Sequence, residues 1–345
     1  MAVTEPIVAI DLGGTRLRVA LVDTQGNVVR RVAEETRSEE GPERVAQRIR
    51  DMAQGLLDEA GAVRPMAVGA ALASPVDLEG MMHRPPNLTG WQVVPFKSML
   101  AERFGVPVWV GNDANVAALG EHVFGAGKGI GDMIYLTIST GVGAGVITGG
   151  RLLLGARGLG GEIGHMIIAR RPAPWQRAPA SCGHIGCLES YVSGGAIARR
   201  AVAGLRKGRR SSLAELSGGD VESIEAKQVF QAAAQGDAFA GELIEAVGRD
   251  LALGLASLIH LFNPRKFIIG GGVSRNWAML EKSVLDELRR QVMPGFLDDL
   301  EIVVSQFGDD VGLVGAAALA LQEIGAGTGP SSGHERGRLS PAAKR

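Results

Sequence analysis

The stretch Ile7-Val8-Ala9-Ile10-Asp11-Leu12-Gly13-Gly14-Thr15-Arg16-Leu17-Arg18-Val19-Ala20-Leu21-Val22 decides the fold of this chain. Two apolar runs flank the glycine-rich turn Asp11–Thr15, a pattern typical of a β-hairpin. The same plan returns at Ser139–Gly145, between apolar runs at 133–138 and 146–147. Glycine lets a ligand approach the backbone, and the N–H groups of such turns bind phosphate. The repeat predicts a duplicated α/β core in which each half offers one phosphate-binding hairpin to a cleft between two domains.

The order of the predicted elements indicates mixed sheets covered by helices. Three early strands are joined by short turns, which differs from the strand–helix start of a Rossmann fold. Ser274 is a plausible N-cap of a helix, and we expect the final helix to pack back on the first domain. The expected strands are 7–11, 16–23, 27–33, 66–72, 107–110, 133–139, 144–148, 267–269 and 301–304, and the expected helices are 42–60, 114–121, 237–262, 275–291 and 311–323.

The length and composition suit a globular protein of two domains. The 345 residues have a hydrophobic content of 46%, a mean hydropathy of +0.12 and a net charge of −1. We expect a smaller domain from residues 1–113 and about 308–324, a larger one from 114–307, and a disordered tail at 325–345, which is rich in Gly, Ser, Pro and charge.

The charge and hydropathy also bear on partners and compartment. There is no basic stripe, which argues against nucleic acid or an anionic membrane as the main partner. No apolar run approaches the ~20 residues that span a bilayer, and the N-terminus has no signal-peptide pattern. We therefore expect a cytoplasmic protein, which assembles as a homodimer or a higher homo-oligomer.

The glycine-rich turns are the candidate nucleotide-binding elements. A G-x-x-x-x-G-K-[ST] loop is absent, since Gly127-Lys128 is followed by Gly129, and no strand leads through G-x-G-x-x-G into a helix. A third glycine turn, at 270–272, follows a predicted strand and suits a ribose or adenine, although a simple helix-entry loop explains it equally. The predicted ATP-binding residues are Asp11, Gly13, Gly14, Thr15, Thr140, Gly141, Gly143, Gly271 and Gly272.

Asp113, in the turn Gly111-Asn112-Asp113, is the candidate catalytic residue. A carboxylate at a strand end can accept the proton of a hydroxyl that attacks a phosphoryl group. The alternative is a structural role, because either Asn112 or Asp113 could cap the helix that follows. A polyol needs several carboxylate and amide partners for its hydroxyls, and other such side chains stand in distinctive turns. The further candidates for binding a sugar are Asn87, Asn112, Glu162, His165 and Glu189.

Five motifs in order resemble the ROK family of sugar kinases and repressors, in particular its glucokinase-like branch. They are Asp11-Leu12-Gly13-Gly14-Thr15, Pro86-Asn87-Leu88-x-Gly90-Trp91, Gly111-Asn112-Asp113-Ala114-Asn115, Gly160-Gly161-Glu162-Ile163-Gly164-His165 and Cys182-Gly183-x-x-Gly186-Cys187-Leu188-Glu189.

The resemblance implies an α/β, two-domain actin/hexokinase-like (ribonuclease H-like) fold with a cleft between the domains. It also implies transfer of phosphate from MgATP to the 6-hydroxyl of a hexose, with Asp113 as base and Asn112, Glu162, His165 and Glu189 around the sugar. Glucose is the first choice of acceptor, for an enzyme at the entry to glycolysis. Mannose, N-acetylmannosamine and fructose remain open as acceptors, and polyphosphate remains open as donor.

Two departures from the family pattern concern metal and sugar. The family's zinc would be held by a histidine, here His165, and three cysteines, but Ala180 replaces one of them, leaving Cys182 and Cys187. A structural zinc takes four ligands; His184 could supply the fourth, and a metal-free loop is the alternative. The segment 166–181 is also longer than usual and rich in Arg, Pro and Ala. In the sugar loop 71–77, Ser74 replaces a glycine.

The same family contains repressors, so a sugar-responsive regulator without a DNA-binding domain is the alternative of a different class. ROK repressors carry a helix-turn-helix ahead of the first strand, whereas only Met1–Pro6 precede it here. The chain also has no basic recognition helix. Chaperones and filaments of the same broad fold would lack the sugar loops. We therefore expect an enzyme.

Overall fold

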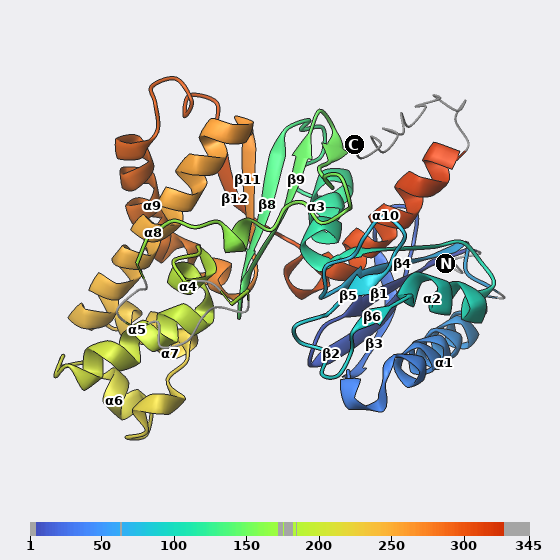
Figure 1. Ribbon diagram of the computed structural model, residues 1–345, viewed down its shortest axis with the longest axis horizontal. Helices are drawn as coiled ribbons and strands as arrows, with labels where there is room; N and C mark the ends of the chain where they lie inside the picture. The colour runs from blue at the N-terminus through green and yellow to red at the C-terminus, as the bar shows by residue number, and fades with distance from the viewer. Residues whose placement is uncertain (1–4, 63, 172–174, 176–181, 184, 328–345) are drawn as a thin grey trace, which may run out of the picture.

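The computed structural model describes residues 5–62, 64–171, 175, 182–183 and 185–327. Within these residues the chain builds two five-stranded sheets, each with helices on its faces (Figure 1). The predicted disordered tail lies outside this range from residue 328 onward. Its first three residues are helical instead, because the last helix, α10 (Val311–Gly327), continues through them.

The first sheet has the strand order β3-β2-β1-β4-β7. The first three strands pair antiparallel, and β4 and β7 add on in parallel. Every residue of β1 is buried because both faces of the sheet are covered there, whereas the edge strand β3 is largely exposed. These strands are β1 (Ile7–Leu12), β2 (Arg16–Val22), β3 (Val28–Glu35), β4 (Ala67–Leu72) and β7 (Val108–Asn112).

The second sheet repeats that plan with the order β10-β9-β8-β11-β12. Again the hairpin strands pair antiparallel, and two later strands join in parallel. The predicted duplication is therefore present in the topology. The strands are β8 (Met133–Ile138), β9 (Val142–Thr148), β10 (Arg151–Leu152), β11 (Lys266–Gly270) and β12 (Glu301–Val304), and a separate small sheet pairs β5 (Met82–His83) with β6 (Val93–Val94).

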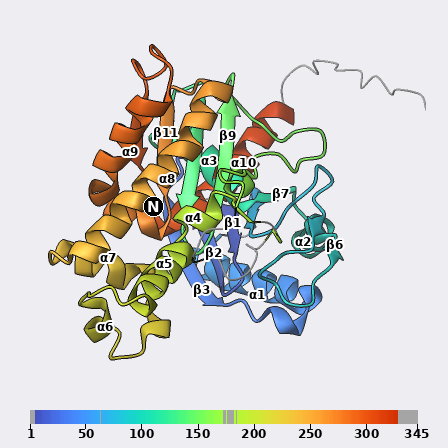
Figure 2. The same ribbon diagram turned by 60° about the vertical axis from the view of Figure 1, so that its left-hand side comes forward.

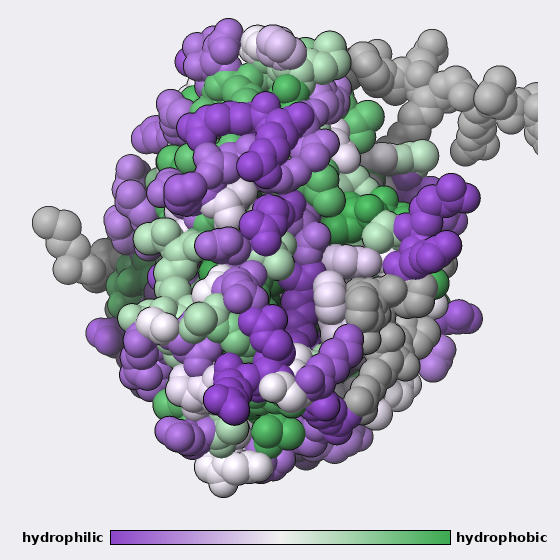
Figure 3. Space-filling model, turned by 90° about the vertical axis from the view of Figure 1, so that its left-hand side faces the viewer, coloured by the Kyte–Doolittle hydropathy of each residue, from purple (hydrophilic) through white to green (hydrophobic). Residues whose placement is uncertain are grey.

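Helices cover the outer faces of both sheets. On the first sheet, α1 (Pro42–Ala60) and α2 (Phe96–Phe104) enclose one hydrophobic core. On the second sheet, a larger core forms beneath the 25-residue helix α8 (Ala238–Phe262) and the helices around it. Those helices are α4 (Glu189–Val192), α5 (Gly194–Arg206), α6 (Leu213–Leu216), α7 (Ala226–Ala234) and α9 (Trp277–Gln291). The side of the molecule on which these helices lie is mostly hydrophilic, with smaller apolar areas between (Figure 3).

Two helices, α3 (Asp113–Phe124) and α10, lie between the sheets (Figure 1). α3 packs on β8 and β9, α10 packs on β1 and β4, and the two helices pack on each other. Glycine permits this close approach: a Cβ on Gly315 would lie 2.1 Å from the Val116 carbonyl oxygen, and one on Gly69 would lie 1.8 Å from that of Ala316. As expected, the final helix returns to the first sheet, and it connects that sheet to α3.

All the predicted strands and helices are present, with bounds that differ from the observed ones by up to four residues. The prediction that Ser274 caps α9 is wrong, because its hydroxyl donates to the carbonyl of Gly271 (2.7 Å) inside a 3₁₀ turn, Gly272–Asn276, and α9 begins only at Trp277. The helices α2 and α4–α7 and the two-residue strands β5, β6 and β10 were not predicted. None of the described helices is long and apolar enough to cross a bilayer.

Candidate active site

Asp113 is the first residue of α3, at the point where β7 ends. Asn112 is the N-cap: its Oδ1 accepts from the backbone N–H groups of Ala114 (3.1 Å) and Asn115 (3.2 Å). Its Nδ2 donates to the carbonyl of Ser74 (3.2 Å), which ties the sugar loop to the same corner. Because Asn112 supplies the cap, the partly buried carboxyl of Asp113 is not required for that task.

Two other carboxylates, Asp11 and Glu162, act on the carboxyl of Asp113. Burial raises the pKa of Asp113 to about 7, and the negative charges of Asp11 and Glu162 add to the rise. The N–H of Ala114 donates to the Asp113 carboxylate (2.8 Å) and opposes the shift. A carboxyl group with a pKa near 7 exchanges protons readily at neutral pH, as a general base must.

The first hairpin carries an ion pair next to its glycine turn. Asp11 and Arg18 face each other across β1 and β2, with Arg18 Nη2 2.6 Å from Asp11 Oδ2. Burial raises the pKa of Asp11, and the Arg18 guanidinium opposes that rise. Arg18 also donates to the carbonyl of Asp309, in the 3₁₀ turn Gly308–Asp310 that leads into α10. Sequence analysis missed Arg18, although the hairpin register alone places it opposite Asp11.

The turn of this hairpin is closed by a backbone hydrogen bond, and Asn87 packs against it. The N–H of Gly13 donates to the carbonyl of Arg16 (3.0 Å), and Thr15 is exposed at the tip. A Cβ on Gly14 would lie 2.5 Å from Cβ of Asn87. The structure therefore brings the predicted sugar residue Asn87 into contact with a predicted phosphate residue.

The second hairpin has the same arrangement with different partners. Thr140 is exposed at its tip, and a Cβ on Gly141 would lie 2.6 Å from Oε2 of Glu189. That same oxygen accepts from the backbone N–H of Val142 (3.0 Å). A Cβ on Gly143 would lie 3.0 Å from Cβ of Ala114, so this glycine lets the start of α3 lie close to the hairpin.

The third glycine turn follows β11. Gly271 has a positive φ of 81° and no space for a side chain, since a Cβ would lie 2.4 Å from the carbonyl oxygen of Ile138. Gly272 has no atom within 4 Å of where its Cβ would be. The turn thus packs against the end of β8, next to the second hairpin, while its Gly272 side is open.

His165 lies between a carboxylate and two thiols. Its Nε2 is 3.8 Å from Glu162 Oε2, and its Nδ1 is buried without a hydrogen-bond partner. One ligand atom from each of His165, Cys182 and Cys187 lies within 4.8 Å of the others. An orphaned imidazole nitrogen and two sulfur atoms form a donor set that suits zinc. His184, the predicted fourth ligand, lies outside the described residues.

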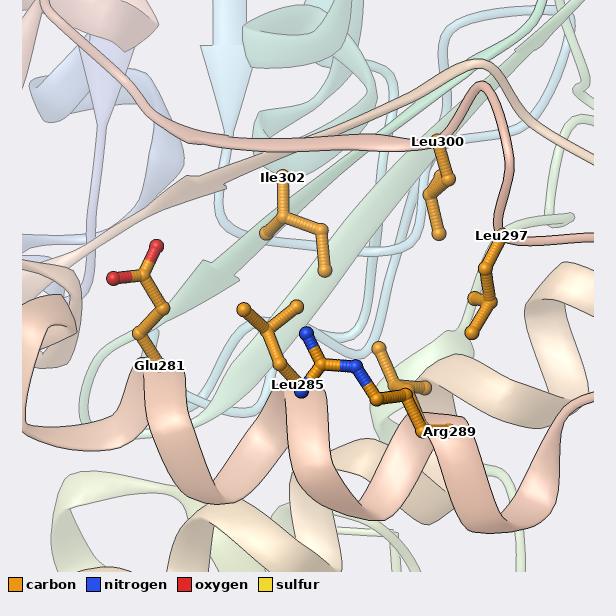
Figure 4. Close-up of a pocket in the computed structure, with 7 residues that line it drawn as sticks. Glu281, Leu285, Arg289, Leu297, Leu300 and Ile302 are labelled. Atoms are coloured by element: carbon orange, nitrogen blue, oxygen red, sulfur yellow. The ribbon is translucent and has the colours of Figure 1, made fainter.

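Two cavities lie away from the predicted residues. One cavity, of about 360 Å³, lies between α9 and the segment Leu297–Ile302; leucine and isoleucine side chains line it together with Glu281 and Arg289 (Figure 4). The other, of about 320 Å³, lies beside α8. The candidate site is instead the region where the two hairpins, the start of α3 and the His165 loop meet.

Two sheets of one topology, joined through α3 and α10, define a two-domain α/β protein of the actin/hexokinase-like fold. The chain matches the ROK family over residues 7–323, and it belongs to that family. It is 38% identical to a glucokinase of Thermotoga maritima over 320 residues, which cover 92% of this chain and 98% of the relative.

Solved structures agree with that assignment. A ROK family glucokinase from Streptomyces griseus, in complex with glucose and AMPPNP, is 34% identical, with a TM-score of 0.77 over 92% of this chain and 99% of that one. A ROK family transcriptional regulator, a homologue of the E. coli MLC protein, is 28% identical, with a TM-score of 0.83 over 94% of this chain and 79% of that one. The fold is thus shared by kinases and regulators, and residues of the site must distinguish them.

Proposed function

We propose that this protein is a hexose kinase that transfers the γ-phosphoryl group of MgATP to the 6-hydroxyl of glucose. The observation that carries the proposal is the carboxyl of Asp113, placed at the start of α3 beside the second hairpin, with its pKa raised to about 7. The similarity to glucokinases over nearly the whole chain, and to one that holds glucose and an ATP analogue, supports the same reaction.

In this proposal Asp113 accepts the proton of the 6-hydroxyl as its oxygen attacks the γ-phosphorus. The bond between that phosphorus and the bridging oxygen breaks, and ADP leaves. Backbone N–H groups of the Asp11–Thr15 and Ser139–Gly145 turns would hold the phosphates, and Asp11 would help to place Mg²⁺ through water. Gly271 and Gly272 would lie along the ribose or adenine.

The sugar would lie among side chains from four segments. Asn87, Asn112, Glu162, His165 and Glu189 are the proposed binding residues. Sugars that differ at one or two carbons are discriminated by whether buried polar groups of the site are left unpaired. Ser74, whose hydroxyl donates to the carbonyl of Pro75 (3.0 Å), lies in the loop that Asn112 holds and could influence that choice.

A coupled assay tests the proposal with glucose, mannose, N-acetylmannosamine and fructose as acceptors, and ATP and polyphosphate as donors. We expect the highest kcat/KM for glucose with ATP. If kcat/KM for glucose is tenfold below that of another hexose, the transition state is stabilised by about 1.4 kcal/mol more with that other sugar. The proposed substrate would then be that hexose, and the proposal of a hexose kinase would stand. Binding of a hexose without turnover of any hexose would favour the sugar-responsive regulator, which the similarity to a ROK transcriptional regulator also allows.

We also propose that His165, Cys182 and Cys187 hold a structural zinc, with His184 as the fourth ligand. The proximity of the three ligand atoms and the unpartnered Nδ1 of His165 support it. The ion would fix the loop that leads to Glu189 and orient His165 towards the sugar. Metal analysis of protein purified without a His tag decides the matter: a closed four-ligand site should hold about one equivalent, and less than about a tenth would rule it out.

The remaining proposals concern organisation. We propose that residues 1–113 with 308–324, and residues 114–307, form the two domains, and that the protein acts as a cytoplasmic homodimer or higher homo-oligomer at the entry to glycolysis. The near-neutral charge and the absence of a membrane-spanning helix among the described residues support a soluble setting. Light scattering on the purified protein would measure the number of subunits.

A further inference from the structure

A buried guanidinium lies behind the short helix that carries Glu189. Arg200 of α5 is only 6% exposed, and its Nη2 forms an ion pair with Asp250 of α8. Among the described residues, its Nε and Nη1 have no hydrogen-bond partner. A buried charged group needs compensation beyond one ion pair, so other groups must account for the remaining two nitrogen atoms.

Two aromatic rings supply that compensation. The guanidinium carbon of Arg200 is 4.0 Å from the ring centroid of Trp175 and 5.7 Å from that of Tyr191. The two rings meet edge to face, with centroids 5.5 Å apart. Arginine stacked on an aromatic face is stabilised by the ring quadrupole, most strongly with tryptophan and away from water. Trp175 belongs to the segment that sequence analysis singled out as longer than its family counterpart.

Trp175 also holds the backbone of α4. Its indole N–H donates to the carbonyl of Ser190 (3.2 Å), the residue that follows Glu189. A helix of four residues is not stable by itself, because nucleation costs more than so few hydrogen bonds return. The position of α4, which lies next to α5 in Figure 2, therefore depends on such tertiary contacts.

The other side of α4 meets the second hairpin. Glu189 accepts from the N–H of Val142 (3.0 Å), and the N–H of Gly194, at the start of α5, donates to the carbonyl of Ser139 (2.7 Å). The short helix is thus held between the hairpin and Trp175. A change on the Trp175 side would move the Glu189 carboxylate relative to the sugar.

We propose that Trp175 is a positioning residue for sugar binding: by stacking on Arg200 and holding the carbonyl of Ser190, it sets the place of Glu189. The proposal rests on the sugar-binding role proposed above for Glu189. It does not require Trp175 to touch the sugar, nor the zinc to be present.

The test compares wild-type protein with Trp175→Ala, Trp175→Phe and Arg209→Ala. Arg209→Ala is the matched control, since Arg209 stacks on Phe239 (4.8 Å) rather than on the rings beside α4. Steady-state kinetics give kcat and the KM values for glucose and ATP, calorimetry gives the Kd for glucose, and metal analysis follows the zinc. Trp175→Phe keeps a ring for the stack and loses the N–H donor.

For Trp175→Ala we expect the glucose KM and Kd to rise about tenfold, while kcat and the ATP KM stay within about twofold, because a stack and a hydrogen bond are lost away from the reacting atoms. Trp175→Phe should lie between it and wild type, and Arg209→Ala should match wild type. If Trp175→Ala does not fold, Trp175→Phe decides, and an unchanged glucose Kd then overturns the proposal.

Other outcomes separate this proposal from the function on which it rests. If the wild-type protein phosphorylates glucose and the Trp175→Ala variant has an unchanged glucose KM, the role of Trp175 is overturned and the proposed function stands. A parallel loss of bound metal in the variant also overturns it, because the effect would then belong to the metal site. Wild-type protein that neither binds nor phosphorylates any hexose overturns both proposals.

Discussion

The two hairpins share one position in two sheets of the same topology, but they differ in what stands next to the turn. In the first, the second pair back from the turn is Asp11 and Arg18, and in the second hairpin the equivalent pair is Thr137 and Gly143. The first hairpin therefore carries an ion pair at this position. The second has no side chain at Gly143, and α3 packs there so closely that an added Cβ would lie 3.0 Å from Cβ of Ala114. The first hairpin thus carries charge, whereas the second leaves room for the first turn of α3, which begins at Asp113.

The turns themselves show a second parallel. In each, a glycine contacts a residue predicted to bind sugar: Gly14 meets Asn87, and Gly141 meets Glu189. Gly14 faces Cβ and the backbone of Asn87, which cannot move without the chain. Gly141 faces the carboxylate of Glu189, the end of a flexible side chain. Residues proposed to bind sugar and phosphate thus lie against each other in both halves, but Asn87 has less freedom to move away from Gly14 than the Glu189 carboxylate has from Gly141.

The largest effect should come from Asp113, at the start of the helix that packs against the second hairpin. Asp113→Asn should lower kcat by roughly 10²–10⁴-fold, the usual contribution of a general base, while calorimetry still detects glucose binding. Asp51→Asn, on the exposed face of α1, is the control and should keep full activity. Near wild-type turnover in Asp113→Asn would reject the assignment of the base.

Alanine variants of the two turn glycines test how freely Asn87 and Glu189 can move away. Gly14→Ala should lower the free energy of unfolding by about 1–3 kcal/mol, since its Cβ would meet Cβ and the carbonyl oxygen of Asn87, at 2.5 and 2.7 Å. Gly141→Ala should leave stability nearly unchanged and raise the glucose KM, because Glu189 can move aside.

Denaturant unfolding and steady-state kinetics measure the two effects. Gly272→Ala is the control for stability, as nothing lies within 4 Å of its Cβ, and it should raise only the ATP KM. Equal loss of stability in Gly14→Ala and Gly141→Ala would contradict the difference drawn between the turns.

The pH dependence should show the raised pKa of Asp113. The base must be ionised to accept a proton. At pH values below its pKa of about 7, kcat/KM for glucose should therefore fall about tenfold per pH unit. The pKa in the folded state, about 7, exceeds the ordinary value of 3.8, so folded protein binds more protons between these pH values. This group's contribution to the free energy of unfolding should therefore decrease as the pH rises from about 4 to 7.

Asp113→Asn removes that titration, so it should flatten the stability profile over the same window. Denaturation in buffers across this range measures the difference between wild type and variant. If kcat/KM begins to fall only below pH 5, the essential base is a group with an ordinary carboxyl pKa.

The smallest effect should come from the ion pair of the first hairpin. Arg18→Met keeps the stem of the side chain and removes the charge that opposes protonation of Asp11. The Mg²⁺ concentration for half-maximal activity should rise by about two- to fivefold, since a carboxyl that ionises less holds the ion less well. A lower requirement for Mg²⁺ would instead mean that Arg18 competes with the ion for Asp11.

Local patterns predicted the elements that contain the site. The apolar runs around Asp11–Thr15 and Ser139–Gly145 predicted two hairpins, and Gly111-Asn112-Asp113 predicted a strand end followed by a capped helix. Such features depend on neighbours within a few residues, which is why a sequence alone can reveal them. The wrong prediction that Ser274 caps α9 also has a local cause, because its hydroxyl donates to the carbonyl of Gly271, three residues before it.

Amino-acid sequence by itself determined the duplicated hairpins, the ROK family and the acidic residues placed around Asp113. Tertiary structure alone decided that Glu189 would meet the second hairpin, that Trp175 would stack on Arg200, and that glycines would let α3 and α10 pack between the sheets. These contacts join segments tens to hundreds of residues apart. Their geometry depends on how whole helices dock, and no pattern of neighbouring residues encodes that.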